Sequence, residues 1–223
     1  MNKKAARPAA QIGLRERNRL DKLARIKAAA GGLFTELGFD RATTRAIAKR
    51  AHVGLGTLFN YADDKRDLVF LIFNEELDRI TDRAFAAVNP RAPLLDQLLT
   101  AFGVFYREFG ARATLARILL QELTFYSGGR LAADFQRSRR RTIGFIERLI
   151  EVARREGRIR TDEDPAFIAL TVFYVYAGAV RRWIAARRPD PNGGLRELRR
   201  ALELLVSGLA AGTPAKSARR PRR

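Results

Sequence analysis

The sequence contains no cysteine among its 223 residues, and its only histidine is His52. The absence of cysteine excludes a disulfide framework and a thiolate metal site, and nothing points to an oxidising compartment. The sequence also has no apolar run long enough to span a membrane. The longest run, residues 166–180, is shorter than the ~20 residues that a membrane-spanning helix needs. We therefore expect a buried helix there, and a cytoplasmic protein without a membrane partner, a metal site or a cofactor.

Acidic residues are scarce relative to basic ones. The chain has 43 lysines and arginines against 24 aspartates and glutamates, which gives a formal net charge of +19. This balance favours a polyanionic partner, since clustered cations gain free energy by displacing counterions from nucleic acid. Charge alone leaves a membrane surface open as well. Hydrophobic residues make up 47% of the sequence, enough for a substantial globular core.

Strand patterns are absent, and helical apolar spacing alternates with glycine and proline breaks. The sequence predicts an all-α fold with two domains: a helix-turn-helix domain over residues 15–62 and a larger helical domain over residues 63–211, which opens with a linking helix at 63–88. The other expected helices cover residues 15–36, 94–109, 111–126, 131–156, 165–188 and 195–211. The basic ends, residues 1–14 and 212–223, are expected to be a disordered arm and tail.

The segment 43–68 predicts two short helices that meet at a tight turn. Thr43 can accept the free N–H groups at the start of the first helix, whose inward face includes Ile47. The pattern breaks at His52, where a residue that tolerates left-handed backbone is wanted. It resumes in a second helix anchored by Leu58, which is too short to be stable alone. This is a helix-turn-helix arrangement, which DNA-binding proteins use to enter the major groove.

The same segment resembles the DNA-binding pattern of TetR-family transcriptional regulators. The matching positions are Thr43, Ile47, Ala48, Ala51, Val53, Gly56, Thr57, Leu58, Phe59, Tyr61, Lys65 and Leu68. Residues 28–39 also resemble that family's first helix and its Gly-Phe exit, so the close resemblance covers residues 20–75. Beyond it only length and helical layout agree, which implies a ligand-sensing and dimerising domain.

The resemblance implies a set of DNA-contacting residues. They are Thr44, Arg45, Leu55, Gly56, Thr57, Phe59, Asn60, Tyr61 and Lys65. Within this set, Arg45 matches a position that reaches a base, Thr44 one that holds a phosphate, and Lys65 one that faces the phosphate backbone. Tyr61 matches a position that faces either DNA or the core.

The chain departs from the family pattern on its second short helix. Phe59 replaces the usual tyrosine, and Gly54 and Leu55 stand where serine or lysine is common. A phosphate hydrogen bond is thereby lost. Base reading is expected to depend on Arg45, Thr57 and the backbone at Gly56.

The sequence motifs that could indicate catalysis lack the neighbouring residues and secondary structure that catalysis needs. Residues 54–59 contain part of a dinucleotide-binding loop, but Phe59 replaces the third glycine and no strand precedes it. The acids Glu75, Glu76 and Glu108 lie on arginine-rich helices, where solvated ion pairs explain them. No nucleophile, base and orienting group occur together, so we expect no enzyme activity.

Aromatic side chains are dense in the second domain. Core packing explains any one of them, whereas together they can also line a cavity in which a few polar groups orient an apolar ligand. The candidate cavity residues are Phe102, Phe105, Tyr106, Gln121, Glu122, Phe125, Tyr126 and Tyr174. The sequence thus favours a repressor that is released by a small, mostly apolar effector. The alternative is a constitutive nucleic-acid-binding protein without an effector.

The last predicted helix carries a repeating leucine stripe, and the helix before it is almost wholly apolar. We expect two copies to pack these helices into a four-helix interface, although the last helix can instead close the core of its own subunit. The expected interface residues are Gly178, Ala179, Leu198, Leu202, Leu205 and Leu209. Such a homodimer would bind an inverted-repeat operator in double-stranded DNA.

Overall fold

The computed structural model describes residues 13–122 and 128–210, without the side chains of 208–210, and all regular structure in these residues is helical. The helices are α1 (Leu14–Leu37), α2 (Thr44–Arg50), α3 (Leu55–Phe59), α4 (Lys65–Ala86), α5 (Leu94–Ala111), α6 (Ala113–Glu122), α7 (Ala132–Arg155), α8 (Pro165–Ile184) and α9 (Pro191–Ala210). The predicted all-α fold is confirmed. The expected arm and tail lie outside the described residues, apart from Gly13 and Leu14.

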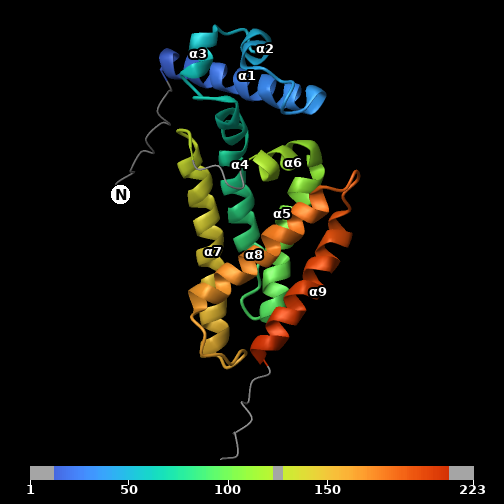
Figure 1. Ribbon diagram of the computed structural model, residues 1–223. Helices are drawn as coiled ribbons and strands as arrows, with labels where there is room; N and C mark the ends of the chain where they lie inside the picture. Colours follow the sequence, from blue (N-terminus) through green and yellow to red (C-terminus); the bar gives the residue numbers. More distant parts are fainter. Residues whose placement is uncertain (1–12, 123–127, 211–223) are drawn as a thin grey trace, which may run out of the picture.

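Helices α1, α2 and α3 form a small head at one end of the molecule (Figure 1). Its core contains Ile26, Phe34, Ile47 and Leu58, which are fully buried. The five-residue helix α3 is held by this core, since so short a helix is unstable in isolation.

Local sequence signals define the ends of the head's helices. Thr43 caps α2 through its side-chain oxygen, which accepts a 3.1 Å hydrogen bond from the backbone N–H of Ala46. Gly38 ends α1 with a φ of 79°, and His52 in the turn between α2 and α3 has a φ of 52°. These predictions are confirmed. A left-handed backbone at both turns folds the two short helices back against α1.

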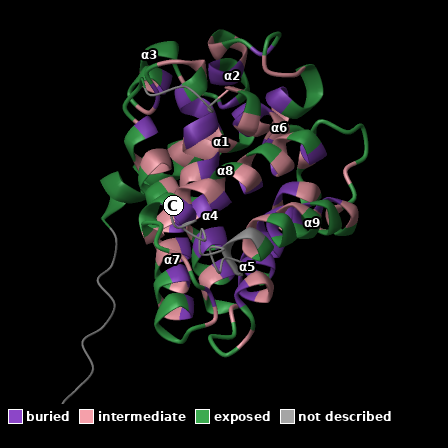
Figure 2. Cartoon of the chain, turned by 60° about the horizontal axis from the view of Figure 1, so that its bottom comes forward, coloured by how far each residue is buried: buried purple, intermediate pink, exposed green. Residues whose placement is uncertain are grey.

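Helix α4 connects the head to a body made of α5 to α9 (Figure 1). Its start is capped by Asp64, which accepts a 2.8 Å hydrogen bond from the N–H of Asp67. Helix α7 packs beside α4 and under α8, while α5 packs against α9. Buried residues line the facing sides of these helices (Figure 2), including the stacked rings of Phe102 and Tyr176, whose centroids are 4.2 Å apart.

Helix α8 is long and apolar enough to cross a membrane by length and composition. In the body it packs against α5, α6, α7 and α9, and its residues Ala169, Val172 and Val180 are buried there. The predicted helix is therefore present, but it is buried only on the side that faces the body, since Phe167 and Tyr174 on its other side are exposed.

The last helix begins four residues earlier than predicted, at Pro191 instead of Leu195. Asp190 caps the added turn, since its carboxylate accepts hydrogen bonds from the N–H groups of Asn192 and Gly193 at 3.0 and 2.8 Å. Residue 194, inside this first turn, has to be glycine, because a Cβ there would come within 2.5 Å of the Trp183 and Tyr106 rings. The predicted break at residues 189–194 therefore ends at 190.

Leu198 and Leu202 require a correction. The leucine stripe of α9 packs onto α5 within the same subunit, and these two side chains are fully buried there. A residue without accessible surface has none to lose to a partner, so Leu198 and Leu202 are core residues and not interface residues. Leu205 is half-buried against the same core.

Candidate DNA-reading head and ligand cavity

Helix α3 presents one face outward from the head. Leu55, Gly56, Phe59 and Asn60 are exposed on it, whereas Leu58 on the opposite face is fully buried. Thr57 is half-buried. The exposed face has the orientation that a recognition helix needs to enter a major groove.

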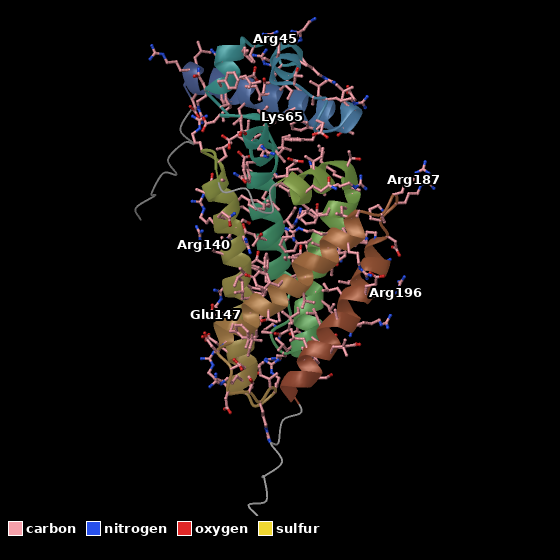
Figure 3. All side chains as sticks on the ribbon, in the orientation of Figure 1. Arg45, Lys65, Arg140, Glu147, Arg187 and Arg196 are labelled. Atoms are coloured by element: carbon pink, nitrogen blue, oxygen red, sulfur yellow. The ribbon has the colours of Figure 1, made fainter. Side chains whose placement is uncertain are left out.

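The two short helices carry no carboxylate. Between Thr43 and Ala62 the sequence has no aspartate or glutamate, but it contains Arg45, Lys49 and Arg50. Arg45 projects away from the head (Figure 3) and is exposed, as is Lys49. A surface of this kind attracts a polyanion.

Arg50 differs from the other two cations because it is bound within the head. Its guanidinium donates two hydrogen bonds, of 2.6 and 2.7 Å, to the carboxylate of Glu36 on α1. These hydrogen bonds lower the pKa of Glu36 and raise that of Arg50. The pair joins α1 to α2.

Lys65 and Tyr61 are both held by the head. The Lys65 ammonium donates hydrogen bonds of 2.8 and 3.2 Å to the carbonyls of Phe39 and Asp40, and it lies 4.2 Å from the centre of the Phe39 ring. In this arrangement its ammonium is directed at the loop before α2, in place of the phosphate contact that the family resemblance implied. The Tyr61 hydroxyl donates a 3.2 Å hydrogen bond to the Arg19 carbonyl, so this ring is directed at α1.

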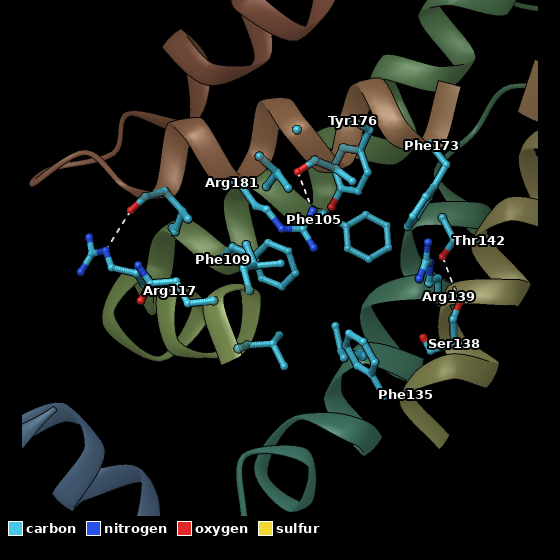
Figure 4. A pocket seen from close by; sticks show the side chains of 18 of the residues that line it. Phe105, Phe109, Arg117, Phe135, Ser138, Arg139, Thr142, Phe173, Tyr176 and Arg181 are labelled. Carbon is cyan, nitrogen blue, oxygen red and sulfur yellow. Dashed lines mark hydrogen bonds between the residues drawn. The ribbon is translucent and has the colours of Figure 1, made fainter. Parts of the chain in front are cut away.

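A cavity of about 920 Å³ lies in the body between α4, α5, α6, α7 and α8. Its apolar walls include Phe105, Phe109, Phe135 and Phe173 (Figure 4). This volume and lining are typical of a binding site for a small organic molecule.

Three of the eight predicted cavity residues line the cavity, namely Phe105, Gln121 and Tyr174. Phe102 and Tyr106 instead fill the core, where Tyr106 packs at 4.6 Å from the Trp183 ring. Those two predictions are wrong.

Glu122 does not line the cavity either. Its carboxylate lies 3.4 Å from the Arg66 guanidinium in an ion pair beside α4. Phe125 and Tyr126 lie outside the described residues.

Helix α7 supplies a cavity wall that the prediction omitted. Its contribution consists of Phe135, Ser138, Arg139 and Thr142. These residues recur at the spacing of one helical face, which was the signal available in the sequence.

Three guanidinium groups line the cavity, and no carboxylate is among the described residues around it. Arg139 lies over the Phe173 ring at 5.3 Å, and Arg181 donates a 2.8 Å hydrogen bond to the Ala177 carbonyl. Arg117 donates hydrogen bonds of 3.1 and 3.0 Å to the carbonyls of Ile184 and Ala186 near one end. The cavity is therefore electropositive as well as apolar.

Burial shapes the ionisation of the polar groups in this wall. It lowers the pKa of Arg181, and the neighbouring Arg139 charge lowers it further, while Tyr176 opposes the shift. Burial also raises the pKa of the Tyr176 hydroxyl, which stays protonated and able to donate a hydrogen bond. An anionic group would relieve the unfavourable proximity of the two guanidinium groups.

The loop before α7 contacts the head. The Arg130 guanidinium donates a 3.1 Å hydrogen bond to the carbonyl of Asn60, which directly follows α3. The N–H groups of Arg130 and Leu131 donate to the carboxylates of Asp63 and Asp67, at 3.2 and 3.4 Å. The helix that forms one wall of the cavity thus also touches the end of α3.

Helices α8 and α9 carry large apolar side chains that are exposed to solvent, and we refer to them together as the exposed apolar stripe. Phe167 and Tyr174 are 59% and 56% exposed, and Leu204 on α9 is 79% exposed. Gly178 is exposed on α8, whereas Ala179 is half-buried against the core. The side chain of Leu209 lies outside the described residues.

Metal-ligating side chains do not cluster in residues 13–122 and 128–210: no group of three or more histidine, aspartate or glutamate residues could hold an ion there.

Comparison with known proteins finds a family match for the head. Residues 26–72 match the family model described as bacterial regulatory proteins, tetR family. Across most of its length, the chain is similar to the uncharacterized HTH-type transcriptional regulator YhgD of Bacillus subtilis. The two are 26% identical over 195 residues, which cover 86% of this chain and 98% of the relative.

Two solved structures share the fold of the whole molecule. FadR of Bacillus subtilis in complex with stearoyl-CoA superposes with a TM-score of 0.67 at 21% identity, covering 83% of this chain and 98% of that one. FadR of Thermus thermophilus, a TetR-family repressor in complex with lauroyl-CoA, superposes with a TM-score of 0.65 at 23% identity, covering 90% and 100%. The helix-turn-helix head thus matches the model of the TetR family of bacterial regulatory proteins, and the chain as a whole has the fold of TetR-family transcriptional regulators.

Proposed function

We propose that this regulator is a cytoplasmic repressor that binds an inverted-repeat operator as a homodimer and is released by an acyl-CoA thioester. The observation that carries the effector is the cavity of about 920 Å³, which combines phenylalanine walls with three arginines. The acyl-CoA ligands of the two similar FadR structures support the same choice.

The chemistry of an acyl-CoA fits this lining. A fatty acyl chain would gain hydrophobic free energy against Phe105, Phe109 and Phe135. The phosphates of the CoA moiety are anions, and guanidinium groups form strong, charge-assisted hydrogen bonds with phosphate. Arg117 at the α6 and α8 wall and Arg139 on α7 are the proposed phosphate and carbonyl partners.

On the DNA side, the proposed contacts are those of the head's exposed surface. Thr44, Arg45 and the outward face of α3 would enter the major groove. Two heads related by a two-fold axis would read half-sites about 34 to 36 Å apart, or a multiple of that helical turn. Lys65 and Tyr61 would support the head from behind.

The proposed dimer uses the exposed apolar stripe of α8 and α9. Phe167, Tyr174 and Leu204 are large apolar side chains that a monomer would leave in water, and Gly178 would permit close approach of the partner's helix. This stripe replaces the deeper residues Leu198 and Leu202 that the sequence suggested.

The test combines DNA selection with ligand release. Duplexes bound by the full chain are selected from a random pool, and the affinity for the consensus is measured with lauroyl-CoA, stearoyl-CoA or CoA alone. We expect a palindromic consensus and a 5- to 150-fold loss of affinity with an acyl-CoA, which is about 1 to 3 kcal/mol of coupling. CoA alone should have little effect because it lacks the acyl chain.

Arg139→Gln and Arg140→Gln form a matched pair for the cavity. Arg139 lines the cavity, whereas its neighbour Arg140 is exposed on the same helix (Figure 3). Only Arg139→Gln should weaken acyl-CoA binding. A consensus that no acyl-CoA releases would support a constitutive DNA-binding protein instead.

A further inference from the structure

The reading helix α3 exposes two apolar side chains to solvent. Leu55 is 37% exposed and Phe59 is 41% exposed. They are four residues apart, so both lie on the same side of the helix, next to the side that holds the buried Leu58. Leu58 is fully buried in the core of the head, whereas the other two side chains keep part of their apolar surface in solvent.

The positive charge around Leu55 and Phe59 favours a polyanion as their binding partner. No carboxylate occurs between Thr43 and Ala62, while Arg45 and Lys49 are exposed on the neighbouring helix α2. An apolar patch framed by cations complements duplex DNA better than it complements a neutral protein surface.

The chemistry of the two side chains restricts what they can touch in a duplex. Neither has a hydrogen-bond donor or acceptor, so neither can hold a phosphate or pair with a polar base edge. The apolar group that a base pair presents in the major groove is the C5-methyl group of thymine. A leucine or phenylalanine buried against it removes apolar surface of both partners from water.

We infer that Leu55 and Phe59 recognise thymine methyl groups in each operator half-site. The inference rests on the proposed DNA-binding function and adds to it the base that α3 requires. Hydrogen-bonding residues such as Arg45 then specify other positions, and the apolar pair adds a preference for thymine over cytosine and purines.

The test removes only the methyl groups. In the duplex selected by the full chain, each thymine is replaced in turn by deoxyuridine, which keeps every hydrogen-bonding group. We expect one or two positions per half-site at which the substitution weakens binding about four-fold, the equivalent of about 0.8 kcal/mol for one buried methyl-sized group. The remaining positions should tolerate uracil.

Protein variants assign the effect to the two residues. In Leu55→Ala, and separately in Phe59→Ala, the uracil penalty should disappear at the position that the residue contacts and persist elsewhere. Leu37→Ala is the matched control, because Leu37 at the end of α1 is also 37% exposed but lies on another element of the head. It should keep the full pattern of penalties.

Several outcomes would overturn the inference. A consensus half-site without thymine would do so, as would a consensus whose thymines all tolerate uracil within experimental error. Penalties that remain unchanged in both alanine variants would show that uracil acts through DNA shape instead. A pool that yields no consensus at all would overturn the proposed function, and the inference with it.

Discussion

The Arg130 guanidinium donates a 3.1 Å hydrogen bond to the backbone carbonyl of Asn60, the residue that ends the reading helix. Arg130 lies two residues before α7, whose next turns carry the cavity residues Phe135 and Arg139. A displacement of α7 on ligand binding would therefore reach α3 through this contact as well as through α4. The head thus contacts the cavity walls through this loop, in addition to α4 and the packing of α1 against α6.

The first prediction concerns the hydrogen bond between Arg130 and the Asn60 carbonyl. Arg130→Ala should increase hydrogen exchange of the backbone amides at residues 58–62, because the carbonyl of Asn60 loses its charged donor. The 5- to 150-fold acyl-CoA effect on operator affinity should fall towards unity while acyl-CoA binding itself is retained. Arg140→Ala, exposed on the same helix, is the control. Unchanged exchange and unchanged release in Arg130→Ala would leave α4 and the packing of α1 against α6 as the connections.

The second prediction separates Lys65 from Arg45. Lys65→Met should lower the free energy of unfolding by about 1.5 to 3 kcal/mol, because two carbonyls lose a charged hydrogen-bond donor. It should leave the salt dependence of operator binding nearly unchanged. Arg45→Ala should leave stability unchanged and cost about 1 to 3 kcal/mol of binding if it pairs with a base. Urea unfolding and binding at several salt concentrations measure the two effects; a fall of about one in the salt slope for Lys65→Met would restore its phosphate role.

The third prediction concerns assembly. Leu204→Glu places a charge on the exposed stripe and should produce a folded monomer, since the charge would be desolvated only in the dimer. Leu202→Glu places the same charge in the subunit core, where an unpaired charge costs several kcal/mol and should unfold the body. Light scattering at low concentration, together with a thermal unfolding curve, distinguishes them. A dimeric Leu204→Glu protein would remove that side chain from the interface.

The fourth prediction concerns the start of α9. Gly194→Ala should cost about 1 to 3 kcal/mol of stability, because the added Cβ would overlap the Trp183 and Tyr106 rings at 2.5 Å. Gly144→Ala is the matched control within α7, where the nearest atom to the added Cβ is the flexible end of Arg148, at 3.7 Å. It should be neutral or stabilising by up to about 1 kcal/mol, the helix propensity difference. Equal effects of the two substitutions would contradict the close packing at Gly194.

The head was predictable because its signals are local. Thr43 needs only its own side chain and a nearby N–H group to cap α2, and the turn at His52 follows from the backbone geometry that one residue must adopt. Such features depend on a few residues that are neighbours in the sequence, so the sequence alone contains all the information needed to predict them.

The body was less predictable because its contacts are distant in sequence. A leucine stripe shows that one face of α9 is covered, but it does not state whether α5 or a second subunit covers it, and Leu198 and Leu202 were assigned to the wrong one. The cavity raised the same difficulty. Tyr106 fills the core whereas Arg139 lines the cavity, and only the packing of α7 and α8 against α5 separates these two fates.

Trp183 packs closely between Gly194 and Tyr106, so its intrinsic fluorescence reports on the packing of the body. It is the only tryptophan in the sequence, and His52, the only histidine, lies in the turn of the head. Indole fluorescence from the one and the imidazole proton resonance from the other each arise from a single site. The absence of cysteine also leaves any engineered thiol free of competing sites for a spectroscopic label. Motions of the head and of the body can therefore be followed separately in the unmodified protein, and the distance between them can be followed with one added label.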